Sequence, residues 1–444
     1  MEFLYLILAV LAIIGMTAYL KWHPFLALLL VSIIYAIASG MSLSSLIEAI
    51  NTGFGGTLGK IGLIIVIGVI IGAFLEHSGG ARTLARTVLK WIGSRRIPLA
   101  MGVLGYVVSI PVFCDSGFML LDPLGKSLSR NAKVSLAGAA VALGLGLMAT
   151  HVLVPPTPGP IAAAGILQAD LGLVILYALP VSLLAMVAAV LFASRYASRT
   201  YLDPGTAIAE DAAQQEKATP EKDPPFAKAV LPIIIPILLI VLKSTLWDKA
   251  GEGTVNTLIG FLGEPVIALL IGMFLSFTLP AQWDSKMLSA SGWVGKGIRD
   301  SSSILLITGA GGIFGQVLEM SGIAASLGSS LQGLELGILL PFLLAAALKT
   351  AQGSSTVALV TGASILFPML ADLGLTSETD KALSVVALGA GSAVISHAND
   401  SFFWVVTQMS GMDVRTGYRL FSLGTLVLGT TAALGVFICS MIVG

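Results

Sequence analysis

Three ionisable side chains lie within stretches of the sequence that are otherwise apolar: Asp115, Lys349 and Asp400. A charge at the middle of a bilayer costs about 2.5 to 3.5 kcal/mol on insertion scales, so a membrane protein keeps one there only where it faces a polar cavity. We therefore expect the three side chains to share such a cavity. Lys349 could provide the counter-charge for a substrate carboxylate; it could also reach the outer surface or pair with Asp400.

Small polar residues and glycines flank these charges. Ser116 and Gly117 follow Asp115 directly, and residues 352–356 follow Lys349. Their hydroxyl, carboxamide and free backbone N–H groups suit a ligand that has a carboxylate or several hydroxyls. The same groups also suit the capping of helix ends, and both uses can coexist.

Four side chains are candidates for carrying a proton. Asp115 and Asp400 are candidates because the protonation of a buried carboxyl group responds to nearby charge and could follow substrate occupancy. A fixed structural carboxylate that accepts backbone hydrogen bonds is the alternative. His151 and His397 titrate near neutral pH, although a neutral imidazole bonded to a free carbonyl is the more common use at a helix break.

The composition predicts an all-α integral membrane protein. Of the 444 residues, 56% are hydrophobic and only 11% are charged, and the mean hydropathy is +0.95. A soluble protein needs about 25% charged residues, so soluble enzymes and nucleic-acid-binding proteins are excluded. The 24 basic and 24 acidic residues balance, and Cys114 and Cys439 have no metal-ligand spacing. We expect no metal and no cofactor.

Two long apolar segments are interrupted by polar tips, and we expect each to be a re-entrant hairpin, at about 97–130 and about 336–371. Basic residues stand before and after the first segment, at 82–96 and 126–133. Mainly acidic residues flank the second segment. By the positive-inside rule, both flanks of the first segment lie in the cytoplasm and both flanks of the second lie outside. Each segment therefore returns to the side from which it entered. A non-helical tip is tolerated there only where protein or a cavity surrounds it.

Two further segments are predicted to be broken helices. The span at about 134–168 contains Pro155, Pro156, Pro158 and Pro160, and proline cannot continue a helix because it lacks an N–H group and clashes with the preceding turn. The span at about 382–412 carries the polar run 396–401 at mid-depth. Its break is inferred from polarity alone.

The chain divides into two related halves, 1–194 and 229–444, joined by a polar linker at 195–228 that cannot fold alone. Residues 75–81 match residues 318–324 at five of seven positions, and the later features follow in the same order. Each half is expected to have five membrane crossings and one hairpin. Because the number of crossings is odd, the second half has the opposite orientation in the membrane to the first. This inverted-topology repeat is typical of secondary transporters, with the linker cytoplasmic and both termini outside.

Three motifs resemble signatures of the gluconate permease family: 396–404, 352–358 and 155–160. The resemblance implies a multi-pass protein of the bacterial inner membrane, a proton symporter for gluconate or a related sugar acid, often homodimeric; the family also has a D-serine branch. Thr157, Lys349 and Phe402 depart from the family pattern, which has His, Arg and Gly there in many members. With the resemblance, the candidate substrate-binding residues are Asp115, Ser116, Gly117, Thr150, His151, Thr157, Lys349, Gln352, Gly353, Ser354, Ser355, Thr356, His397, Asn399 and Asp400.

The expected mechanism is an elevator in which residues 97–168 and 336–412 carry the substrate past a scaffold made from the early helices of each half. D-serine or another small hydroxy or amino acid, and coupling to sodium, remain alternatives. A channel would need a continuous polar face, and an intramembrane enzyme would need a nucleophile with a base, or a metal cluster. A primary pump is disfavoured because the sequence has no phosphate-binding loop. The expected partners are therefore a small anionic substrate, protons and membrane lipid, with no nucleic acid.

Overall fold

The computed structural model describes residues 2–93, 96–204, 223–246, 254–321 and 337–443. Throughout these residues the regular structure is helical, without a strand. The first half contains α1 Glu2–Ile14, η1 Gly15–Tyr19, α2 Pro24–Ala38, α3 Leu43–His77, α4 Gly80–Ile92, α5 Ile97–Val108, α6 Cys114–Asn131, α7 Leu136–Leu153, α8 Pro158–Leu167, α9 Leu171–Arg195 and η2 Ala197–Arg199. The second half contains α11 Phe226–Leu246, α12 Thr254–Leu262, α13 Pro265–Ser276, η4 Ser285–Leu288, α14 Trp293–Met320, α16 Leu339–Gln352, α17 Ser355–Leu366, η5 Phe367–Met369, α18 Glu378–Ala393, α19 Ser401–Ser410, α20 Val414–Gly417, η6 Tyr418–Ser422 and α21 Leu423–Val443.

The apolar helices make this a membrane protein. Among the described residues, six helical stretches are long and apolar enough to cross a bilayer, and a seventh is counted if the pair α12 and α13 forms one span. That pair bends by 66°. The break falls before Pro265, which stands at the start of α13, where the N–H group that proline lacks would have no partner within the helix anyway.

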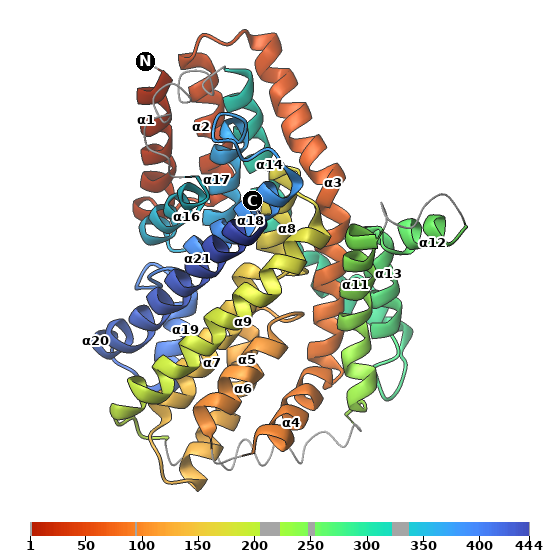
Figure 1. Cartoon of the computed structure of the whole chain (residues 1–444), viewed down its shortest axis with the longest axis vertical. Coiled ribbons are helices and arrows are strands. Elements are labelled where there is room, and N and C mark those ends of the chain that lie inside the picture. Colours follow the sequence, from red (N-terminus) through yellow and green to blue (C-terminus); the bar gives the residue numbers. More distant parts are fainter. Residues whose placement is uncertain (1, 94–95, 205–222, 247–253, 322–336, 444) are drawn as a thin grey trace.

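The longest helix among the described residues is α3. It begins at Leu43, where the side chain of Ser42 accepts a hydrogen bond from the backbone N–H of Ser45. Its glycines allow close packing: a Cβ atom on Gly53 would lie 2.7 Å from the Cα atom of Ile313 in α14. Figure 1 shows α3 running along most of the long axis of the molecule.

The elements of the two halves occur in the same order. Helices α5 and α6 are separated by residues 109–113, and α16 and α17 by residues 353–354. Helix α7 then ends at Leu153 and α8 begins at Pro158, while α18 ends at Ala393 and α19 begins at Ser401. Each half therefore contains a helix pair with a short non-helical tip, followed by a helix interrupted by a longer break.

These interrupted elements pack against one another across the two halves. A Cβ atom on Gly389 in α18 would lie 3.0 Å from Leu153 at the end of α7. The rings of Phe118 in α6 and Phe402 in α19 lie 6.2 Å apart. The segment 136–167 is almost wholly buried inside the protein, so the break between α7 and α8 lies in the protein interior, where irregular backbone is tolerated in a membrane protein.

Both described ends of the linker are anchored to the first half. Before the gap, the hydroxyl of Ser135 donates to the carbonyl of Thr200 at 2.7 Å. After it, Asp223 forms ion pairs with Arg82 at 3.3 Å and Arg86 at 2.6 Å. The region expected as linker thus includes η2 and the first residues of α11, and its middle, 205–222, lies outside the described residues.

Candidate substrate site

A buried ion pair joins the tip between α16 and α17 to the break before α19. Lys349 lies in the last turn of α16, and its Nζ atom donates to Oδ2 of Asp400 at 2.6 Å. The side chains are 1% and 7% exposed. The Lys349 ammonium also donates to the carbonyl of Gly353, a residue with a φ of +87° that favours glycine. Lys349 therefore pairs with Asp400 instead of reaching the surface.

Asp400 is held by further donors. It caps α19 by accepting from the backbone N–H of Phe402 at 3.1 Å, and it accepts from the hydroxyl of Ser396 at 2.5 Å. Such charge-assisted bonds are the strong ones in proteins. With Lys349 they give this carboxylate three donors, which fixes its position.

The polar run 396–401 also closes the end of α16. His397 lies with Nε2 2.8 Å from the carbonyl oxygen of Thr350. The Nδ2 atom of Asn399 donates to the carbonyls of Thr350 at 3.0 Å and Ala351 at 3.2 Å. The last carbonyls of a helix lack partners within the helix. The side chains of His397 and Asn399 act as the partners of these carbonyls in α16.

Most hydroxyl groups at the second tip bond to nearby backbone. Ser354 caps α17 by accepting from the backbone N–H of Val357 at 3.3 Å, and Ser355 donates to the carbonyl of Ser392 in α18 at 2.8 Å. Thr356 is half-buried in the first turn of α17. Gln352 is 8% exposed, and its Oε1 atom lies 3.5 Å from the hydroxyl of Thr17 in η1.

The first half supplies the facing group of side chains. Asp115 and Ser116 are half-buried in the first turn of α6, while Gly117 is buried and packs on Leu147 of α7. Thr150 donates to the carbonyl of Tyr106 at 3.0 Å. The contact of Gly117 with Leu147 and the hydrogen bond of Thr150 hold the hairpin against α7. The Asp115 carboxylate remains available for other partners.

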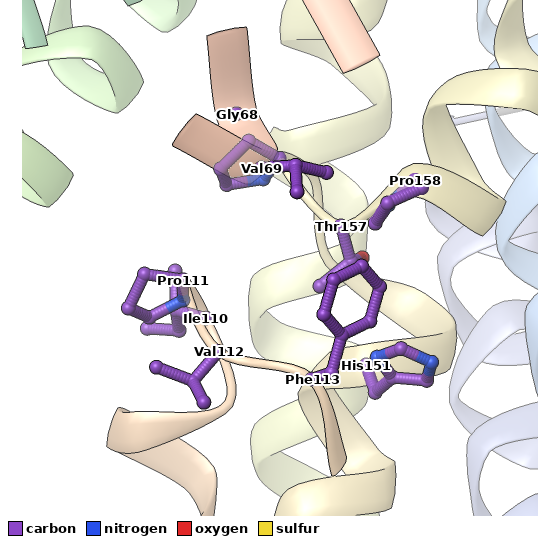
Figure 2. A pocket seen from close by; sticks show the side chains of 10 residues that line it. Gly68, Val69, Ile110, Pro111, Val112, Phe113, His151, Thr157 and Pro158 are labelled. Carbon is purple, nitrogen blue, oxygen red and sulfur yellow. The ribbon is translucent and has the colours of Figure 1, made fainter. Parts of the chain in front are cut away.

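A small pocket lies beside this group, with about 10 Å³ of free space, which is room for about one water molecule. Figure 2 shows the turn at Ile110–Phe113 on one side, with His151 and Thr157 of the α7–α8 region across from it and Gly68 and Val69 of α3 above. Thr157 donates to the carbonyl of Val154 at 2.6 Å. The pocket therefore has mainly apolar walls and lies where α3 meets the interrupted elements of the first half.

The two groups of side chains share one electrostatic environment. Asp115 and His151 both interact with the charges of Lys349 and Asp400. The structure thus brings together predicted residues from both halves. Buried polar atoms normally have hydrogen-bond partners, but several here have none among the described residues: Asp115 Oδ1, His151 Nδ1, Gln352 Nε2 and Asn399 Oδ1.

Sequence reasoning missed Thr17 and Tyr106 as parts of this region, and it placed Ser396 in the polar run 396–401 without giving it a role. Thr17 lies in a π-helical turn, a rare form that is frequent at functional sites, but its partner Gln352 is 335 residues away. Ser396 could have been found from its spacing of four residues before Asp400. Tyr106 contributes a backbone carbonyl, which leaves no trace in the sequence. Metal binding has no support within the described part of the chain, where no three His, Cys, Asp or Glu residues cluster.

The fold and this interior polar site define a membrane permease. The family model for GntP family permeases matches residues 1–442, and the chain belongs to this family. It is 34% identical to a gluconate permease of Pseudomonas aeruginosa, over 99% of this chain and 98% of that protein. It is 31% identical to the D-serine transporter DsdX of Escherichia coli K12, over 99% of this chain and 98% of that protein.

A solved structure shares the fold. The crystal structure of the Alcanivorax borkumensis YdaH transporter matches with a TM-score of 0.61 at 16% identity, covering 90% of this chain and 89% of that one. The family model and the relatives named gluconate permease confirm the resemblance to the gluconate permease family that the sequence motifs indicated. Membership of a family of permeases also agrees with the expectation that the chain is not an enzyme.

Proposed function

We propose that this protein is a proton-coupled symporter that imports gluconate or a related sugar acid across the bacterial inner membrane. Relatives named gluconate permease support the substrate class. The observation that carries the proposal is the set of unpartnered buried polar atoms around the Lys349–Asp400 pair, counted over the described residues. A bound ligand would supply the missing partners.

The chemistry of these atoms fits a polyhydroxylated acid. Gln352 Nε2 is a donor and Asn399 Oδ1 is an acceptor, and a sugar hydroxyl can bond to both. D-serine is the second candidate, since a relative is named as its transporter, and its ammonium group would need an anion such as Asp115.

Among the four candidate proton carriers, the contacts favour the two whose buried atoms have no partner in the described structure, Asp115 (Oδ1) and His151 (Nδ1), and we take Asp115 as the carrier. Asp400 is committed to hydrogen bonds from Lys349, Ser396 and Phe402. His397 is committed to the carbonyl of Thr350. The Oδ1 atom of Asp115 has no partner in the described structure, so this carboxylate can gain or lose a proton without breaking a hydrogen bond there.

The arrangement of the helices supports an elevator mechanism built on an inverted repeat. Residues 97–168 and 336–412 would form the moving part, and the early helices of each half, including α3 and α14, the scaffold. Both termini would then lie on the outer side, and the protein would form a homodimer. The repeated order of helices in the two halves supports the repeat, and the irregular breaks lying side by side support a common moving unit.

Uptake of labelled gluconate into sodium-free proteoliposomes tests the proposal. An inward proton gradient should stimulate uptake, and excess unlabelled D-serine should leave it unchanged. One proton moved with one monoanion transfers no net charge, so the pH gradient alone would drive it, at about 1.4 kcal/mol per pH unit. Failure of gluconate to enter, with uptake of D-serine instead, would move the substrate to the second candidate. Uptake that requires sodium would contradict proton coupling.

A further inference from the structure

Helix α4 has a basic outer face that takes no part in the site described above. One side of the helix packs on the protein and holds its buried residues: Gly80, Ala81, Leu84, Ala85 and Val88. Arg82, Arg86 and Lys90 follow one another every four residues, which places them in a row on the remaining surface. Lys90 is exposed, and the side chains of Arg82 and Arg86 are 43% and 55% exposed. The helix is therefore amphipathic, with a charged side that faces away from the protein.

The positive charge of this row is only partly neutralised by the described residues. Asp223 forms ion pairs with Arg82 at 3.3 Å and with Arg86 at 2.6 Å, so a single carboxylate faces two guanidinium groups. Lys90 has no ion pair within the part of the chain that the structure describes. Residues 80–93 also contain no acidic residue. The outer face of α4 therefore keeps a surplus of positive charge, to which an anion can bind.

The contacts of Trp91 indicate the depth of this face in the membrane. Its ring packs against that of Phe226, with the ring centroids 5.2 Å apart. Phe226 is the first residue of α11, a helix that is apolar enough to cross a bilayer and only 33% buried inside the protein. Trp91 is 70% exposed, and tryptophan is enriched where membrane meets water. Helix α4, at the lower end of the molecule in Figure 1, therefore lies at the level where a lipid-facing span begins.

A phospholipid fits both features of this face. Its phosphate can accept from arginine and lysine side chains, and its acyl chains can lie beside the exposed ring of Trp91. Basic side chains and a tryptophan on one amphipathic helix are typical of helices that lie in the membrane interface. A soluble anion would use the charges alone. A zwitterionic headgroup would bring a cation next to Lys90, so an anionic headgroup fits best.

We propose that the outer face of α4 binds an anionic phospholipid of the cytoplasmic leaflet, with the headgroup on Lys90 and Arg86 and the acyl chains beside Trp91. The cytoplasmic side follows from the positive-inside rule, because the segment is basic without an acidic residue. Arg86 keeps its ion pair with Asp223, since its guanidinium group has donors for two partners.

Quenching of tryptophan fluorescence by brominated lipids tests this proposal. The full chain is reconstituted into vesicles of phosphatidylcholine and phosphatidylglycerol, and one lipid at a time carries the bromine atoms. Subtracting the signal of Trp91→Phe isolates Trp91 from the other tryptophans. Phosphatidylglycerol should be preferred beside Trp91 by at least about 5-fold, since each basic residue near the surface contributes about that factor. Lys90→Gln should lower the preference about 5-fold, and Lys90→Arg should keep it.

The matched control is Lys243→Gln. Lys243 lies 17 residues after Phe226 in α11, about 25 Å away along the helix, so its loss should leave the preference unchanged. Equal quenching by both lipids, or a preference that Lys90→Gln leaves intact, would overturn the proposal. Trp91 that neither lipid quenches would show that α4 lies outside the bilayer. Loss of the preference on adding inorganic phosphate at constant ionic strength would show that the face binds a soluble anion instead.

Discussion

At the scale of single residues, the Lys349–Asp400 pair makes the strongest connection between the two interrupted regions of the second half. Removing one partner of a buried ion pair leaves the other charge unpaired, which typically costs about 3 to 5 kcal/mol. Lys349→Met and Asp400→Asn should therefore each lower thermal stability in detergent. The double variant should be more stable than either single variant, because it leaves no buried charge.

Transport by the same variants separates two roles of Lys349. If the lysine only pins the tip to the break, the double variant should recover part of the uptake along with its stability. If it also binds the substrate carboxylate, stability should return without uptake. A double variant less stable than both single variants would contradict the view that the two residues act as a pair.

A second prediction at this scale concerns Asp115. Asp115→Asn should keep exchange of gluconate but lower proton-driven accumulation by about 10²-fold, since an amide cannot take up the proton. Asp400→Asn should impair both, because it releases Lys349. Measuring exchange and accumulation in the same vesicles checks this prediction. Accumulation by Asp115→Asn at the wild-type level would show that Asp115 does not carry the proton.

At the scale of elements, the contact between α3 and the first hairpin tip is unusually close. A Cβ atom added to Gly72 would overlap the carbonyl oxygen of Pro111, so only glycine lets the tip approach the helix here. Gly72→Ala should displace the tip and reduce uptake by about 10- to 10²-fold, as small misplacements near a site do. Initial rates of gluconate uptake measure the effect.

The same helix provides the matched control. Gly55 also lies in α3, but a Cβ atom there would meet no heavy atom within 4 Å. Gly55→Ala should leave uptake unchanged and stabilise the helix by roughly 0.5 to 1 kcal/mol. An equal loss of uptake in both variants would mean that helix flexibility matters and not the contact with Pro111.

At the scale of the whole molecule, an elevator requires α8 to move along α3. Ile61 of α3 lies beside Gly165 of α8: a Cβ atom on Gly165 would be 2.7 Å from Cδ1 and 3.1 Å from Cγ1 of Ile61. Cysteines at both positions should come close enough for a disulfide. Oxidation of Ile61→Cys/Gly165→Cys should abolish uptake, and reduction should restore it.

The two single-cysteine variants under the same oxidation serve as controls for the native Cys114 and Cys439. They should transport equally before and after oxidation. Undiminished uptake by the cross-linked double variant, with the disulfide verified on a non-reducing gel, would exclude movement of α8 past α3 and with it the elevator.

The sequence by itself determined the class and the family of the protein, and it predicted interruptions in four of its apolar segments. Charge is too scarce to cover a water-exposed surface, the prolines at 155–160 lack the N–H groups that a continuous helix needs, and the motifs at 155–160, 352–358 and 396–404 indicated the family. These are local or compositional properties, so they can be read without a fold.

The tertiary structure decided which polar residues meet. Lys349 and Asp400 lie 51 residues apart and Thr17 and Gln352 lie 335 apart, and no sequence spacing relates such pairs. The tertiary structure also shows which candidate groups already have hydrogen-bond partners. His397 is bonded to the carbonyl of Thr350, whereas the Oδ1 atom of Asp115 has no partner in the described structure. The reason is physical: whether a buried polar atom is satisfied depends on the packing of helices distant in the chain.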